Sequence, residues 1–198
     1  MTFTEMIVKD QKLPITLAVV PLVAVLLVAA VLLGGNPLHL ALAFVFGWFY
    51  WTLLEYLLHR FLMHWEPRGP LGRFARSLIP GHKHHHEAPT QYEEDGAVLI
   101  KFMIRPALFA LLWWPLVTGS LTIGLAITAG NLAGYLAYEI VHAACHFLKL
   151  NFPYGRALKR HHAVHHYRDD TVNFGVTTTL WDWVFATKWR PQRKRAAA

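Results

Sequence analysis

The sequence predicts an all-α integral membrane protein with four transmembrane helices in two hairpins, capped by a histidine-rich helical part on one side. Its 198 residues are 55% hydrophobic and 16% charged. The mean hydropathy of +0.30 is too high for an ordinary soluble domain. Residues 13–54 and 106–138 contain no Asp, Glu, Lys or Arg. Thirteen histidines outnumber the twelve acidic residues, so the chain uses imidazole far more than typical proteins do.

We expect a single domain over residues 1–198. An apolar stretch of ~20 residues can cross a membrane as a helix, and the first uncharged stretch is long enough for two. The segment GGNP between them and the segment TGS in the second stretch both predict turns. A signal peptide is the alternative for the first span, but its apolar run is too long and no cleavage site stands out. The expected spans are about 13–33, 38–58, 102–120 and 121–144, with the second hairpin slightly short or bent.

Positive charge lies on one side of this predicted topology. Two Lys precede the first span, seven Lys and Arg lie between the second and third, ten follow the fourth, and both opposite turns have none. Cytoplasmic loops carry an excess of Lys and Arg, so both termini and the middle loop are predicted to be cytoplasmic. The cytoplasmic parts are then 59–101 and 145–189. The net charge of +7 suits the membrane surface better than nucleic acid as a partner.

Ten histidines form four groups that this topology brings to the cytoplasmic face. Neutral imidazole is the commonest protein ligand for zinc, copper, iron and nickel. His39, on the opposite side, is expected to be a structural turn residue, and His84 and His161 lie off the helical stripes and are left out. The ten candidate metal ligands are His59, His64, His82, His85, His86, His142, His146, His162, His165 and His166.

The spacing within each group has chemical content. Residues three and four apart share a helix face, so the two HxxHH motifs at 82–86 and 162–166 each align three imidazoles, and HxxxH at 142–146 aligns two. His59 and His64 are five apart, about 140° around an ideal helix of 3.6 residues per turn. They must therefore serve different metals, or the helix must end between them.

Ten imidazoles exceed what one ion can hold. A tetrahedral zinc takes four ligands and an octahedral iron takes six, so the count predicts two metals with roughly five histidines each. Open coordination positions would remain at both metals. An open position is what catalysis needs, whereas a closed structural site has none.

Carboxylates near these groups are expected to accept hydrogen bonds from the second ring nitrogen of ligating histidines rather than to bind metal directly. Glu55 lies four residues before His59, and Glu139 lies three before His142. The single cysteine, Cys145, excludes an internal disulfide and is expected to be a small buried residue. Three further candidate carboxylates follow the last motif: Asp169, Asp170 and Asp182.

The ordered set HxxxxH, HxxHH, HxxxH and HxxHH resembles the fatty acid hydroxylase/sterol desaturase superfamily, most closely the fatty acid 2-hydroxylases. The similarity covers about residues 49–188. It includes EYLLHRFLMH at 55–64 and HHAVHHYRDDTVNFGVTTTLWDWVFAT at 161–187. Two departures are Ala186, where the family usually has Gly, and the longer acidic stretch 91–95, which bears on the substrate entrance.

This resemblance implies a di-iron oxygenase that hydroxylates a lipid acyl chain with dioxygen. The cofactors would be two iron ions, with zinc an alternative occupant in purified protein. The ligating histidines would hold the metals, and no further residue is assigned a catalytic role. Because no cytochrome b5-like or flavin-binding segment fits beside four spans in 198 residues, a separate electron-transfer protein would supply the electrons.

Alternatives remain at this stage. A carotenoid or sterol hydroxylase or desaturase of the same superfamily would use similar motifs, although carotenoid enzymes have a shorter gap than that between His64 and His82. A membrane metal transporter would place ligands along a path near the bilayer midplane, whereas these histidines gather at span ends. A zinc peptidase would need HExxH, which the sequence around His86-Glu87 lacks.

Overall fold

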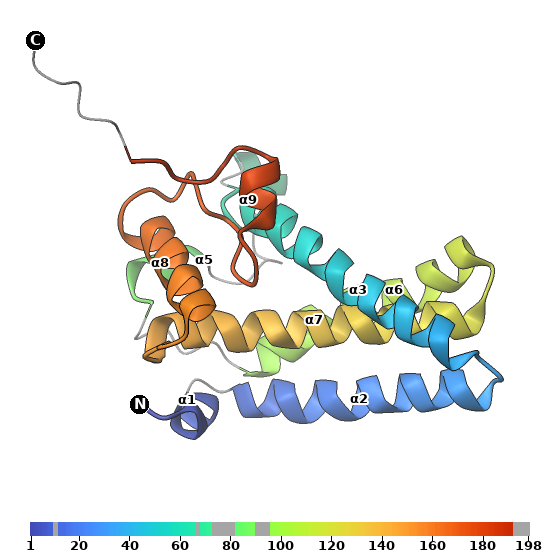
Figure 1. The fold of residues 1–198 in the computed structure, drawn as a ribbon. Coiled ribbons are helices and arrows are strands. Elements are labelled where there is room, and N and C mark those ends of the chain that lie inside the picture. Colours follow the sequence, from blue (N-terminus) through green and yellow to red (C-terminus); the bar gives the residue numbers. More distant parts are fainter. Residues whose placement is uncertain (10–11, 66–67, 73–81, 90–95, 192–198) are drawn as a thin grey trace, which may run out of the picture.

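A computed structural model describes residues 1–9, 12–65, 68–72, 82–89 and 96–191. Within these ranges the regular elements are all helical, which agrees with the predicted fold class (Figure 1). The elements are α1 (Phe3–Lys9), α2 (Lys12–Leu32), α3 (Pro37–Leu57), the π-helix η1 (Leu58–Met63), α5 (His82–Glu87), α6 (Gly96–Thr118), α7 (Leu121–Phe147), α8 (Pro153–Tyr167) and α9 (Leu180–Val184).

Both predicted turns separate helices as expected, and local capping explains where those helices begin. Gly34 takes a positive φ of 86°, and the Asn36 side chain accepts hydrogen bonds from the first amides of α3, with Pro37 at the first helical position. Gly119 takes a φ of 64°, and Ser120 caps α7 in the same way. The sequence therefore encodes both hairpins locally.

Three helices are long and apolar enough to cross a membrane: Lys12–Leu32, Pro37–Met63 and Leu121–Phe147. The expected third span, 102–120, lies in α6, a helix of 23 residues whose described apolar part is Pro106–Thr118. Pro106 and Pro115 stand inside α6, and proline removes a helical hydrogen bond and bends a helix. Within the described residues, three of the four predicted spans thus coincide with helices that are long and apolar enough to cross a membrane, and the bend expected in the second hairpin agrees with the two prolines inside α6.

The long helix α7 is the centre of the fold. It packs against α2, α3 and α6, and buried residues occur along most of its length. It crosses α3 where Gly47 and Gly130 allow the two backbones to touch. A Cβ added at either glycine would lie 2.1 Å from a carbonyl oxygen of the opposite helix. From this crossing α3 and α7 diverge, and α5 and α8 lie at the wide end of the gap (Figure 1).

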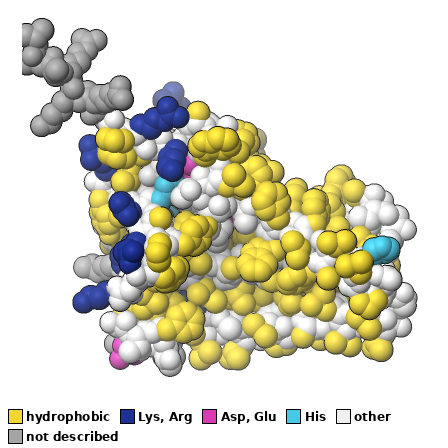
Figure 2. Space-filling view, in the orientation of Figure 1, with side chains coloured by type: hydrophobic (Ala, Val, Ile, Leu, Met, Phe, Trp, Pro, Cys, Tyr) yellow, Lys and Arg dark blue, Asp and Glu magenta, His cyan; other side chains and the backbone are white. Residues whose placement is uncertain are grey.

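The surface separates apolar and charged regions, as a membrane protein requires. Large hydrophobic side chains are exposed along α2, α3 and α6, including Leu17, Leu42 and Leu112. Figure 2 shows this apolar surface over the long helices, with Lys and Arg gathered at the end where α8 lies. Exposed apolar area of this extent is unusual for a soluble monomer and is suited to lipid.

Candidate metal centre

All ten histidines singled out from the sequence lie together at the wide end of the α3–α7 gap. They form two clusters of five, in each of which the five ligand atoms, one from each histidine, lie within 4.8 Å of one another. The first cluster comprises His59, His64, His82, His86 and His165. The second cluster comprises His85, His142, His146, His162 and His166.

Helices α5 and α8 each contribute to both clusters. Each carries one HxxHH motif, and in each motif the first and last histidines enter one cluster while the middle one enters the other. For α5, His82 and His86 join the first cluster and His85 joins the second. The motif on α8 divides the opposite way, with His165 alone in the first cluster. The expectation of three imidazoles on one stripe was therefore too simple. Positions i and i+4 lie about 40° apart around a helix, whereas i+3 lies about 100° from i+4, which is enough to direct the middle histidine at a neighbouring site.

The π-helix η1 explains how His59 and His64 share a cluster. Regular α-helix ends at Leu57, and residues 58–63 continue with the wider π spacing, whose hydrogen bonds join residues five apart. His64 caps this segment, and its ring centroid lies 5.1 Å from that of His59. Of the two alternatives drawn from the 140° angle, the end of the helix between the two histidines is the one found, because η1 ends at Met63.

Two backbone carbonyls orient ligands of the first cluster. Nδ1 of His59 lies 2.5 Å from the carbonyl oxygen of Phe174, and Nδ1 of His165 lies 2.7 Å from that of Val172. A carbonyl can only accept, so both Nδ1 atoms carry the proton and donate. The Nε2 atom of each ring is then a bare lone pair directed into the cluster, which is the form that binds a metal.

The contacts among Nε2 atoms fit metal ions better than hydrogen bonds. Nε2 of His82 lies 3.0–3.2 Å from Nε2 of His59, His64 and His86, although one ring nitrogen has a single proton or a single lone pair to offer. Metal–nitrogen bonds of about 2.1 Å at right angles would put two nitrogens about 3.0 Å apart. The donor set therefore matches a bound cation.

The second cluster shows the same mismatch. Nε2 of His146 lies 2.9 Å from Nε2 of His162 and 3.4 Å from Nε2 of His142. Both ring nitrogens of His166 are buried and have no hydrogen-bond partner among the residues described. Buried polar atoms are nearly always satisfied, so such a nitrogen points to a missing partner, and a metal ion would be one.

Burial keeps the clustered histidines of α5 and α8 neutral. Burial, with smaller contributions from neighbouring histidines, lowers the pKa of His85 to about 2 and of His86 to about 4. Burial likewise lowers the pKa of His165 to about 3, against the opposing effect of its hydrogen bond to Val172. At neutral pH these imidazoles hold lone pairs rather than positive charge, as metal binding requires.

The carboxylates occupy positions that differ from the simple expectation. Glu55 is buried, but its oxygens accept hydrogen bonds from the amides of Val176 and Thr177 and from the Thr177 hydroxyl, while His59 donates to a carbonyl instead. Glu139 forms a buried ion pair with Lys12, with Oε2 and Nζ 2.9 Å apart.

The three candidate aspartates differ in burial: Asp182 is buried, Asp169 is partly buried and Asp170 is exposed. Asp169 is a loop residue that accepts from the amide and hydroxyl of Thr171. Asp182 is fully buried and accepts from the amides of Phe174 and Gly175 and from the Thr187 hydroxyl. Burial raises the pKa of Asp182, but the hydrogen bonds to it prevail, and its pKa lies below the ordinary value.

Segment 172–177, which we call the ligand strap, joins these observations. Its carbonyls at Val172 and Phe174 orient two ligands of the first cluster, and its amides at 174–177 are held by Asp182 and Glu55. The carboxylates therefore act on the ligands through the backbone. Sequence reasoning missed the strap because a backbone carbonyl is present at every residue and leaves no signal in residue type.

The histidines and the cysteine left out of the site lie outside the clusters. His161 is buried, and its Nε2 lies 2.9 Å from Oδ2 of Asp182. This contact links α8 to the carboxylate that holds the ligand strap. His39 is exposed at the first turn of α3. Cys145 is a free, buried thiol, in agreement with the expectation of a small packed residue. The side chain of His84 lies outside the described residues.

Comparisons with known proteins agree with this site. A profile of the family described as fatty acid hydroxylase matches residues 44–187. The ceramide very long chain fatty acid hydroxylase SCS7 of Saccharomyces cerevisiae is 37% identical over 160 residues, which are 77% of this chain and 39% of that protein. The dihydroceramide fatty acyl 2-hydroxylase FAH1 of Arabidopsis thaliana is 33% identical over 148 residues, or 72% and 59% of the two chains.

A solved structure described as full-length scs7p, with only the hydroxylase domain visible, has the same fold. It matches with a TM-score of 0.76 and 32% identity, over 92% of this chain and 68% of that one. The chain spans only about two fifths to three fifths of the length of the two curated relatives above. The profile nevertheless covers most of the chain, including all ten clustered histidines. The chain therefore belongs to the fatty acid hydroxylase family.

Proposed function

We propose that this chain is a membrane-bound dimetal oxygenase that hydroxylates the acyl chain of a lipid. One observation carries the proposal: ten histidines divide into two clusters of five, and in each cluster the five candidate ligand atoms lie within 4.8 Å of one another. Five nitrogen donors would leave a six-coordinate metal with one position not filled by the protein, as a catalytic metal site requires. The curated relatives are named as hydroxylases of ceramide or of fatty acyl chains, which supports a lipid acyl substrate.

Two iron ions are the metals we assign to this site. When bound, iron supplies the activation of dioxygen that organic side chains cannot provide. One oxygen atom enters a C–H bond of the acyl chain, and the other leaves as water after two electrons and two protons arrive. Zinc could occupy the same histidines in purified protein, because imidazole is also a preferred zinc ligand.

The chain's own residues hold and shield this chemistry. The ligand strap and its two carboxylates fix the direction of the imidazoles, and the surrounding apolar residues exclude water from the side that faces the long helices. A polar cleft of about 900 Å³ lies on the other side and includes His64, His86 and His166 in its wall. We assign this cleft to the approach of a separate electron-transfer protein.

The cleft also carries Lys83 and Arg168, beside Asp169 and Asp170. Because Lys and Arg are concentrated in the segments that the positive-inside rule assigns to the cytoplasm, we place both termini and the cleft on the cytoplasmic face. The acyl substrate would come from the bilayer, so lipid and reductant would reach the metals from different sides.

Isotope labelling of lipids tests the reaction. Cells that express the chain, grown under ¹⁸O₂, are expected to contain acyl chains that carry one ¹⁸O atom, detected by mass spectrometry of total lipids. The His146→Ala variant should produce none, because a ligand of the second cluster is lost. Acyl chains that lose two hydrogens without gaining oxygen would make the protein a desaturase. Vesicles that accumulate metal while lipids stay unchanged would make it a transporter.

A further inference from the structure

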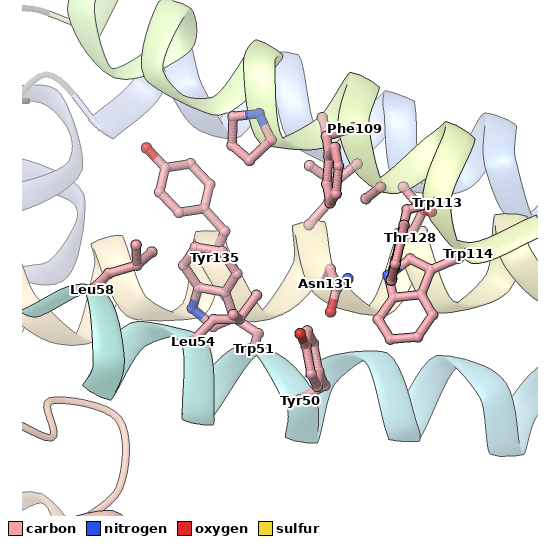
Figure 3. Close-up of a pocket in the computed structure, with 14 residues that line it drawn as sticks. Tyr50, Trp51, Leu54, Leu58, Phe109, Trp113, Trp114, Thr128, Asn131 and Tyr135 are labelled. Atoms are coloured by element: carbon pink, nitrogen blue, oxygen red, sulfur yellow. The ribbon is translucent and has the colours of Figure 1, made fainter. Parts of the chain in front are cut away.

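A cavity of about 400 Å³ lies between α3, α6 and α7, on the membrane side of the metal clusters (Figure 3). This volume is within the range of small-molecule sites. Its wall is built mainly from aromatic and aliphatic side chains. The lining residues are Tyr50, Trp51, Leu54, Leu58, Pro106, Ala107, Phe109, Ala110, Trp113, Trp114, Thr128, Asn131, Leu132 and Tyr135.

The cavity and the second cluster share one face of α7. Thr128, Asn131 and Tyr135 line the cavity at spacings of three and four residues, and Tyr138 and His142 continue the same stripe. The ring centroids of Tyr135 and Tyr138 are 6.5 Å apart, and those of Tyr138 and His142 are 5.6 Å apart. A continuous row of side chains therefore leads from the cavity wall to a metal ligand.

Helix α3 connects the cavity to the first cluster in the same way. Tyr50, Leu54 and Leu58 line the cavity at four-residue steps, and the next residue, His59, belongs to the first cluster. Eight residues of helix from Tyr50 to Leu58 rise about 12 Å. The near end of the cavity, at Leu58, therefore adjoins a histidine of the first cluster along the chain, and the cavity extends from there along the helices, although none of its lining residues is itself a clustered histidine.

Trp114 forms the end of the cavity that is remote from the metals (Figure 3). It is buried, and its ring packs edge-on against Tyr50, with centroids 5.1 Å apart. Its indole N–H donates to the amide oxygen of Asn131 at 3.0 Å, and the Asn131 amide nitrogen donates to the carbonyl of Gly47. The polar groups of Trp114 and Asn131 are thus bonded to the protein and do not compete for the occupant.

We propose that this cavity binds the hydrocarbon tail of the acyl substrate and that Trp114 limits the length of tail it accepts. The inference rests on the proposed function, because the occupant must present a C–H bond at the metals while its tail extends away from them. An apolar cavity whose near end at Leu58 adjoins His59 and whose far end is bounded by Trp114 matches such a molecule. Trp114 is therefore a specificity-determining residue.

Two substitutions change the depth in opposite directions. Trp114→Ala should deepen the cavity and raise the ratio of longer to shorter hydroxylated chains by about tenfold, since each methylene accommodated or refused in an apolar pocket is worth at least about that factor. Ala110→Leu should fill the cavity and shift the ratio toward shorter chains. Leu112→Ala, on the exposed face of the same helix, is the matched control and should change nothing.

The readout is the chain-length distribution of hydroxylated acyl groups in cells that express each variant. If wild type and variants all hydroxylate with the same distribution, the inference fails and the proposed function stands. If wild type produces no hydroxylated lipid, the proposed function itself fails.

Crosslinking provides a second measurement that does not depend on turnover. A fatty acid with a diazirine at its methyl end should label α6 within 106–118 in purified protein, and the label should decrease in Ala110→Leu. Labelling confined to other segments in the wild type would contradict the inference even if Trp114→Ala fails to fold.

Discussion

The ligand strap shows how single residues act on the metals without touching them. The Asp182 carboxylate accepts hydrogen bonds from two strap amides, and the strap carbonyl of Phe174 accepts a hydrogen bond from Nδ1–H of His59. A shift of this backbone would turn the imidazole away from the first cluster. The hydrogen bonds that His59 and His165 donate to strap carbonyls both belong to the first cluster, so we expect the effect to fall first on the metal of that cluster.

We expect Asp182→Asn to weaken binding of one metal and spare the other. The new NH₂ group would face amide donors that now meet an oxygen, and loss of such supporting partners typically costs ten- to a hundredfold in metal affinity. Metal analysis of purified protein should give close to one ion per chain at limiting iron. Asp170→Asn, on an exposed carboxylate, is the control and should keep two. Equal loss from both clusters would show that Asp182 serves only general folding.

The depressed pKa values predict how the metal-free protein responds to acid. The unfolded chain protonates its histidines near pH 6.5, whereas folded His86 and His165 do so only at about 4 and about 3. Below pH 6.5 the unfolded state therefore binds more protons, and the free energy of unfolding should fall as the pH is lowered toward 4. Thermal unfolding of detergent-solubilised, metal-free protein should show this decline, and His86→Gln should reduce its slope. A constant midpoint between pH 7 and 5 would contradict it.

At the scale of the helices, the crossing of α3 and α7 determines the spacing between ligands on these two elements. His59 and His64 extend from α3 through η1, while His142 and His146 stand on α7. Because Gly47 and Gly130 place the two backbones in contact, any added side chain at the crossing must push the helices apart.

Gly130→Ala should therefore harm both clusters together. Its Cβ would lie 2.1 Å from the carbonyl oxygen of Phe44, and overpacking of this kind costs about 1–3 kcal/mol. We expect a lower unfolding temperature and reduced occupancy of both metal sites, measured by calorimetry and metal analysis. Ala41→Leu adds more bulk on an exposed face of α3 and should have little effect. Unchanged stability and metal content in Gly130→Ala would show that the two helices can move apart at this contact without affecting the clusters.

The helices themselves were largely predictable, because apolar length, turn residues and caps are local properties of the sequence. The π-helix η1 was not, since the change from four-residue to five-residue hydrogen bonding at Leu58–Met63 leaves the hydrophobic pattern unaltered. The sequence also did not predict that each HxxHH motif would contribute to both clusters. That division depends on where α5 and α8 lie relative to two metals, which is a property of the assembled fold.

At the scale of the whole molecule, the distribution of charge predicts orientation. We expect the α2–α3 turn to lie outside the cell and the connection between α7 and α8 to lie inside. With Cys145 replaced by serine, a membrane-impermeant thiol reagent applied to intact cells should label His39→Cys but not Asn151→Cys. Both positions are exposed in the structure. The reverse labelling pattern would overturn the cytoplasmic placement of the metal centre.

The convergence of four distant histidine groups could be predicted from topology alone, and the structure brings all ten residues together. The division of these histidines into two clusters could not be predicted, because it depends on the relative positions of four chain segments. The sequence predicted that Glu55 and Asp182 are supporting carboxylates, but not which groups they contact. Their route through the strap backbone depends on contacts between residues more than a hundred positions apart in the case of Glu55.

The most direct test of the account is the number of metal ions in purified protein and in two single-ligand variants. Wild type should bind about two ions per chain. His64→Ala should lose the ion of the first cluster and His146→Ala that of the second, so each variant should retain about one, and the double variant should retain none. One ion per chain in wild type, or a full complement of two in either single variant, would contradict the assignment of two metal sites.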